Sequence, residues 1–152
     1  MRGIADALQS ITATLWVGGL WVIGYVVAPL LFSRLGDRAL AGLIAGKLFS
    51  LIAWIGIACA AYLLIHRLLR YGAGALRQGL FWIVVVMLAL VLAGEFGIQP
   101  VMAALKEQAL PRQVMESVLR DRFAAWHGLS SGLYVIQSVL GAALVILLGR
   151  SK

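Results

Sequence analysis

The chain has 152 residues, of which 62% are hydrophobic and only 12% are charged, against about 25% charged in soluble domains. A soluble fold of this size could not bury so much apolar surface, and a mean hydropathy of +0.98 favours lipid as the surrounding solvent. The net charge of +7 comes from lysines and arginines placed between apolar runs, which is typical of membrane orientation rather than nucleic-acid binding.

Four apolar runs are long enough to cross a bilayer. The first, residues 11–32, contains no charge and as a helix spans about 33 Å, against about 30 Å of hydrocarbon. Three more follow at about 48–65, 80–97 and 127–148. We therefore predict an all-α fold, a four-transmembrane-helix bundle that forms a single integral membrane domain over residues 1–152 and has both termini on one side.

The segment Gln113–Trp126 has a different pattern. Its apolar residues recur near helical spacing and its charged residues fall largely between them. This predicts an amphipathic helix that lies at the membrane interface and runs into the fourth span. The side that holds the termini has the smaller share of acidic residues, so we expect the N- and C-termini to be cytoplasmic in a bacterial inner membrane.

Small residues let helices approach closely in lipid. The predicted helix-packing residues are glycines, four of them in GxxxG pairs: Gly18, Gly42, Gly46, Gly128 and Gly132. Contacts inside the bundle are one explanation, and a face for a second copy of the chain is the alternative.

The fourth span carries one polar face. With one glycine its members step by four, three, four and three residues, and they are His127, Ser131, Tyr134, Ser138 and Gly141. We expect this face to turn toward the other helices, since unpaired polar groups are costly against lipid.

Three ionisable residues should meet at one end of the bundle. Lys47 precedes the second span, Glu95 lies near the end of the third, and His127 opens the fourth, and ionisable groups in or beside spans are functional candidates. The predicted polar pocket consists of Lys47, Glu95, Arg122, His127, Ser130 and Ser131. The alternative is simple anchoring among lipid headgroups. No catalytic motif is found.

Two stretches resemble a known family. They are the segments 46–49 (GKLF) and 122–131 (RFAAWHGLSS), which are similar to stretches of the transmembrane protein 205 family, whose bacterial members carry a domain of unknown function. The resemblance implies a four-span membrane protein with no established reaction. The family is also distantly similar to copper-resistance-D-like membrane proteins and to the four-span protoporphyrinogen oxidase group, some of which bind haem. In that group a histidine and a lysine are implicated at the haem, so the similarity implies haem as an alternative cofactor at His127 and Lys47.

Three functions compete at this point. The first is a non-enzymatic accessory or structural protein with a small polar pocket at the extracytoplasmic face, no cofactor, and the lipid bilayer or a homo-oligomer as partner. The second is a haem- or metal-binding redox protein that uses His127 and Lys47. The third is an oligomeric small-molecule transporter or efflux component.

Overall fold

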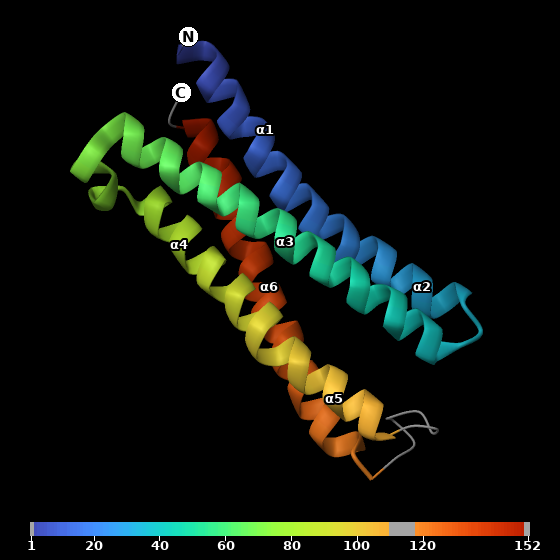
Figure 1. Cartoon of the computed structure of the whole chain (residues 1–152). Coiled ribbons are helices and arrows are strands. Elements are labelled where there is room, and N and C mark those ends of the chain that lie inside the picture. Colours follow the sequence, from blue (N-terminus) through green and yellow to red (C-terminus); the bar gives the residue numbers. More distant parts are fainter. Residues whose placement is uncertain (1, 110–117, 151–152) are drawn as a thin grey trace.

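A computed structural model describes residues 2–109 and 118–150, and all of its long elements are helices (Figure 1). In chain order the elements are α1 (Arg2–Trp21), the π-helical η1 (Val22–Val27), α2 (Ala28–Arg34), α3 (Arg38–Tyr71), the 3₁₀ turn η2 (Gly72–Arg77), α4 (Gly79–Leu92), the π-helical η3 (Ala93–Ile98), α5 (Gln99–Ala109) and α6 (Arg120–Arg150).

These elements form four rods that run up and down. Each is long and apolar enough to cross a membrane, and their bounds are Gly3–Arg34, Arg38–Arg77, Gly79–Gln108 and Arg120–Arg150. The predicted all-α four-helix bundle is confirmed, and the chain is a multi-pass membrane protein. Figure 1 shows both termini at the same end.

Local sequence signals set the ends of α3. Asp37 caps its start, because the carboxylate accepts hydrogen bonds from the backbone N–H groups of Ala39 and Leu40 at 2.8 and 3.2 Å, as expected of an Asp N-cap. Gly72 ends the helix with a φ of 54°, a conformation that glycine adopts without strain.

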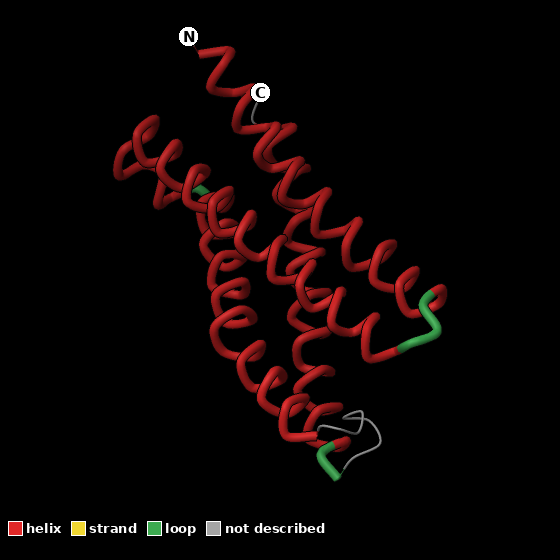
Figure 2. The backbone as a smooth tube through the Cα atoms, turned by 45° about the vertical axis from the view of Figure 1, so that its right-hand side comes forward, coloured by secondary structure: helices red, strands yellow, loops and turns green. Residues whose placement is uncertain are grey.

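The core lies in the half of the bundle nearer the termini. Trp16, Leu63, Met87 and Leu144 come from four different rods, and each is at most 1% exposed. At the opposite end the rods separate into two hairpins, α2 with α3 and α5 with α6, as Figures 1 and 2 both show. The packed half therefore joins all four helices, and the other half presents two diverging pairs.

The region before the fourth span differs from the expected arrangement. The predicted interfacial helix lies partly outside the described residues, and its described part, Arg120–Trp126, is the beginning of α6 itself. The preceding α5 continues the third rod beyond Glu95 and packs on α6. The side chain of Leu105 is buried, and the Lys106 ammonium lies 5.7 Å from the ring centre of Phe123. These contacts hold the first turns of α6 alongside α5.

Candidate functional site

Tyr134 of α6 ties the two hairpins together where they begin to diverge. Its hydroxyl donates a hydrogen bond to the backbone carbonyl of Leu20, 2.6 Å away, and the backbone of Gly24 interacts with the same hydroxyl. Because Leu20 and Gly24 are four residues apart, the phenol lies against one helical turn of the first rod. A side chain that enters such a turn is a recognised cause of local distortion in a helix.

The absence of a side chain at Gly24 makes this insertion possible. A Cβ atom at that position would lie 2.9 Å from Cζ of Tyr134 and closer still to Cε1. Two further rings surround the phenol, with centroids at 5.1 Å for Phe49 and 6.3 Å for Tyr25, both edge-on, a favourable aromatic geometry. Tyr134 is thus fixed from three sides.

A second cross-link joins the residue after Leu20 on α1 to a residue one turn beyond Tyr134 on α6. The indole N–H of Trp21 donates to the backbone carbonyl of Ser138 at 3.3 Å, and Ser138 is itself buried. Polar contacts of this kind contribute to helix association in lipid. Together with Tyr134 they fix the register of the first and fourth rods.

The first and third rods contain matching wide turns. In η1 the N–H of Ala28 bonds to the carbonyl of Ile23, and in η3 the N–H of Gln99 bonds to that of Gly94. A proline, which has no N–H to continue the ladder, follows directly in each case, at Pro29 and Pro100. A π-helical turn can leave a backbone carbonyl without a hydrogen-bond donor from its own helix, and such turns are frequent at functional sites.

Glu95 lies in the second of these wide turns and reaches across to α3. Its carboxylate accepts a hydrogen bond from the hydroxyl of Ser50, and the adjacent Phe96 packs edge-on against Trp54 at 5.8 Å. Glu95 is about 24 Å along the helix from Gly79, within the length of a bilayer core. Its side chain is only half-buried. A partly uncovered carboxylate at this depth is the most unusual polar group of the divergent end.

The other predicted pocket residues lie around this pair without closing over it. Lys47 is one turn before Ser50 on α3 and is exposed, and within the described residues no hydrogen bond or ion pair joins it to Glu95. The His127 ring is exposed and stacks on Phe123, with centroids 5.9 Å apart. The remaining members are Arg122 and Ser131, which are exposed, and Ser130, which is half-buried.

The polar face of the fourth span turns inward only in part. Tyr134 and Ser138 contact the first rod, as expected. His127 and Ser131 belong to the same face but are exposed, and the Ser131 hydroxyl donates back to the His127 carbonyl at 2.9 Å. The reason is the divergence of the hairpins, which leaves this end of α6 without a facing helix from the first pair.

Close packing inside the bundle uses glycines that the GxxxG pattern did not select. A Cβ atom added at Gly56 would press into Trp16. One added at Gly24 would press into Tyr134, and one added at Gly141 into Val17. At the five predicted glycines a Cβ would meet no neighbour within 4 Å in the part of the chain that the structure describes, except Phe32 at 3.8 Å from Gly42. The other four are Gly18, Gly46, Gly128 and Gly132. Contact of these five with another molecule stays a prediction.

A second polar group, at the end of the bundle that holds the termini, was missed from sequence. Arg67 lies beyond the predicted end of the second span, at about residue 65, yet it is inside α3 and only 5% exposed. It falls on the same helix face as Ala60 and Leu63, both fully buried. This three- and four-residue spacing is the signal that could have identified it. Gln9 of α1 is a further buried polar residue.

The sequence matches one family model. Residues 11–111 match the model described as a domain of unknown function, DUF4149. The chain belongs to this family. The matched region includes Lys47, Ser50 and Glu95, but it ends before Arg122 and His127. No curated protein and no solved structure matches the chain.

Proposed function

We propose that this DUF4149 protein is a non-enzymatic accessory or structural membrane protein that associates with a second copy of itself through the divergent end of the bundle. The observation that carries the proposal is the half-buried Glu95 carboxylate, bonded to Ser50 between the third rod and α3. A carboxylate within the span is costly against lipid and needs protein or water around it. A helix of a second copy would supply that cover.

The glycines near this pair favour the same arrangement. Because residues four apart share a helix face, the face of α3 that carries Ser50 continues as Gly46 and Gly42. Beyond its own turn of helix, no atom of the described residues lies within 4 Å of a Cβ placed at Gly46. Small residues that the bundle itself does not use are suited to contact a further helix. The divergent end thus combines a polar group with a surface that permits close approach.

The charge distribution supports an orientation for this assembly. Arg67, Arg70 and Arg77 belong to the end that holds the termini, where Asp6 is the opposing acid. Under the positive-inside rule that end is cytoplasmic, and the divergent end with Glu95 faces the extracytoplasmic side of a bacterial inner membrane.

Measurement of the protein mass in detergent tests the self-association. We expect the wild-type protein to have at least twice the monomer mass of 16.3 kDa by light scattering. Gly46→Leu should shift the population toward monomer by about tenfold in the dissociation constant, since a bulky residue at a close helix contact typically costs 1–3 kcal/mol.

The matched control is Gly149→Leu on α6, another glycine at which a Cβ would meet no described neighbour within 4 Å, and which lies at the end of the bundle that holds the termini. It should keep the wild-type mass. A wild-type protein that is monomeric at all concentrations, or equal masses for the two variants, would contradict the proposal.

The haem alternative, which follows from the more distant resemblance to copper-resistance-D-like proteins, predicts a different spectrum. Under our proposal the purified protein has no Soret absorption, and His127→Ala leaves the spectrum and the thermal stability nearly unchanged. The reason is that His127 is exposed, and the one ring contact of its imidazole within the described residues is with Phe123, one turn earlier in the same helix. A Soret band that disappears in His127→Ala would replace our proposal with the redox function.

A further inference from the structure

Arg67 is a buried cation that pairs with no opposing charge among residues 2–109 and 118–150. It is 5% exposed, and its guanidinium donates a hydrogen bond to the neutral side chain of Gln78. The Tyr71 ring lies 5.7 Å from the guanidinium carbon. The nearby carboxylate of Asp6 is paired with Arg70 instead. Burial of an unpaired charge is strongly unfavourable, so a counter-ion is expected here.

Three buried nitrogen atoms in this half of the bundle have no partner in the described structure. They are Nε of Arg67, Nε2 of Gln9 and Nδ1 of His66, and the first two are N–H donors. The Asp6–Arg70 pair sets the register of the antiparallel α1 and α3. Gln9 lies one turn further into the bundle than Asp6, and Arg67 lies one turn further in than Arg70. The Arg67 and Gln9 donors therefore lie at similar depth on neighbouring helices, and Arg67 is the one that lines a cavity.

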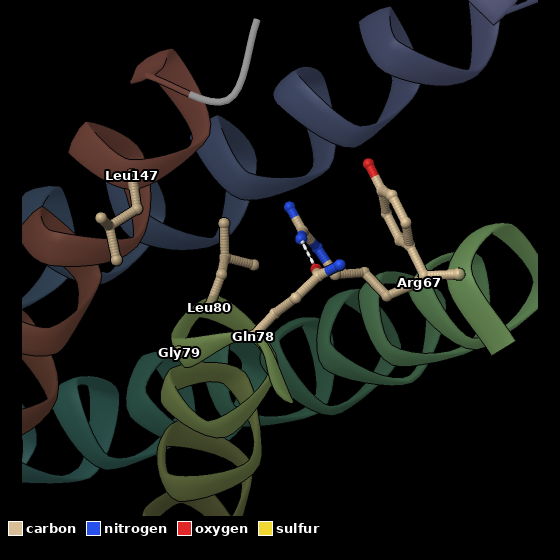
Figure 3. Close-up of a pocket in the computed structure, with 6 residues that line it drawn as sticks. Arg67, Gln78, Gly79, Leu80 and Leu147 are labelled. Atoms are coloured by element: carbon tan, nitrogen blue, oxygen red, sulfur yellow. Dashed lines mark hydrogen bonds between the residues drawn. The ribbon is translucent and has the colours of Figure 1, made fainter. Parts of the chain in front are cut away.

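A cavity lies beside the guanidinium. It has a volume of about 320 Å³ and is lined by Arg67, Tyr71, Gln78, Gly79, Leu80 and Leu147. Figure 3 shows the Arg67 side chain extended to Gln78, with Leu80 of α4 and Leu147 of α6 beyond it. One wall of the cavity is thus cationic and the other is aliphatic.

We propose that this cavity binds a phosphate group, with Arg67 as the principal ligand. The planar guanidinium presents several N–H donors and matches phosphate better than a point charge does. Apolar walls at the level of the membrane surface suit the headgroup of an anionic phospholipid, whose chains would continue along Leu80 and Leu147. Free inorganic phosphate presents the same chemistry without the chains. This site is independent of the proposed self-association, because it lies at the other end of the bundle.

Thermal unfolding of the full-length protein in a neutral detergent, followed by tryptophan fluorescence, tests the site. Three probes are added separately: phosphatidylglycerol, diacylglycerol as a lipid without phosphate, and inorganic phosphate. We expect phosphatidylglycerol to raise the Tm and to appear as a bound lipid in native mass spectra, while diacylglycerol has no effect. An equal rise with inorganic phosphate would identify a free anion as the ligand of the same site.

The matched variants are Arg67→Gln and Arg77→Gln, which remove the same charge from the same end of the bundle, the second from an exposed position. Arg67→Gln should weaken phosphate-dependent binding about tenfold or more, as expected for loss of a charged hydrogen bond, and Arg77→Gln should leave it nearly unchanged. Without added ligand Arg67→Gln should not lower the Tm, since it removes an uncompensated charge.

Arg67→Lys keeps the charge and the long side chain, so it serves if Arg67→Gln does not fold. It should bind more weakly than wild type because the ammonium lacks the planar pair of donors. Wild-type affinity in both Arg67 variants, or equal losses in Arg67→Gln and Arg77→Gln, would overturn the proposal.

Discussion

Gly56→Ala is expected to destabilise the bundle by about 1–3 kcal/mol, the typical cost of inserting a methyl group into a well-packed core. The new Cβ would lie 3.0 Å from Cε2 of Trp16 and closer to its Nε1 atom. Trp16 is 1% exposed and belongs to the main apolar cluster, so its indole cannot move aside without displacing its neighbours. A lower denaturant midpoint in an SDS titration of the detergent-solubilised protein is the expected result.

The control for this variant has the opposite expected sign. Gly18 is also in a helix, but a Cβ there would meet no described neighbour within 4 Å. Alanine is favoured over glycine in helices by up to about 1 kcal/mol. Gly18→Ala should therefore be neutral or stabilising. Equal destabilisation by both variants would show that α1 and α3 do not approach each other at Gly56 as described.

Gly24→Ala is expected to have the second large effect, because it expels the Tyr134 ring from the first rod. The loss of stability has two parts. The steric cost is about 1–3 kcal/mol, and the lost hydrogen bond from the Tyr134 hydroxyl to the Leu20 carbonyl adds about 0.6–2 kcal/mol, the range for such bonds between membrane helices. The sum should appear as a lower SDS-unfolding midpoint, and Tyr134→Phe should reproduce the smaller, hydrogen-bond part alone.

A double-mutant cycle separates this explanation from a general effect of alanine in η1. Once Tyr134→Ala has removed the ring, Gly24→Ala meets no obstacle from that side chain and should cost far less than it does in the wild-type background. Additive losses would mean that Gly24 and Tyr134 are not in contact.

Hydropathy was sufficient to predict the four spans and the shared side of the termini, because lipid requires long apolar helices whatever their packing partners. The inward turn of Tyr134 and Ser138 was also predictable, since both lie on one polar helix face. Their particular partners, the Leu20 carbonyl and the Trp21 indole, depend on the register between the first and fourth rods, which no local pattern encodes.

The candidate site was harder to predict for a physical reason. Topology correctly indicated that Lys47, Glu95 and His127 share one end of the bundle, but it could not indicate that the hairpins diverge there and leave His127 exposed. Glu95 contacts Ser50, one turn from Lys47, and this detail depends on the wide turn at η3. Arg67 was overlooked because a basic residue near a loop is usually exposed, whereas its helix face is buried.

Cysteine cross-linking in native membranes tests most directly whether the divergent end is an interface between copies. In a background with Cys59→Ala, which removes the buried native thiol, Gly46→Cys is compared with Leu69→Cys, a position 84% exposed near the other end of α3. We predict oxidant-dependent covalent dimers for Gly46→Cys and little or none for Leu69→Cys. Dimers at Leu69→Cys alone, or monomers for both, would contradict association through the Glu95–Ser50 end.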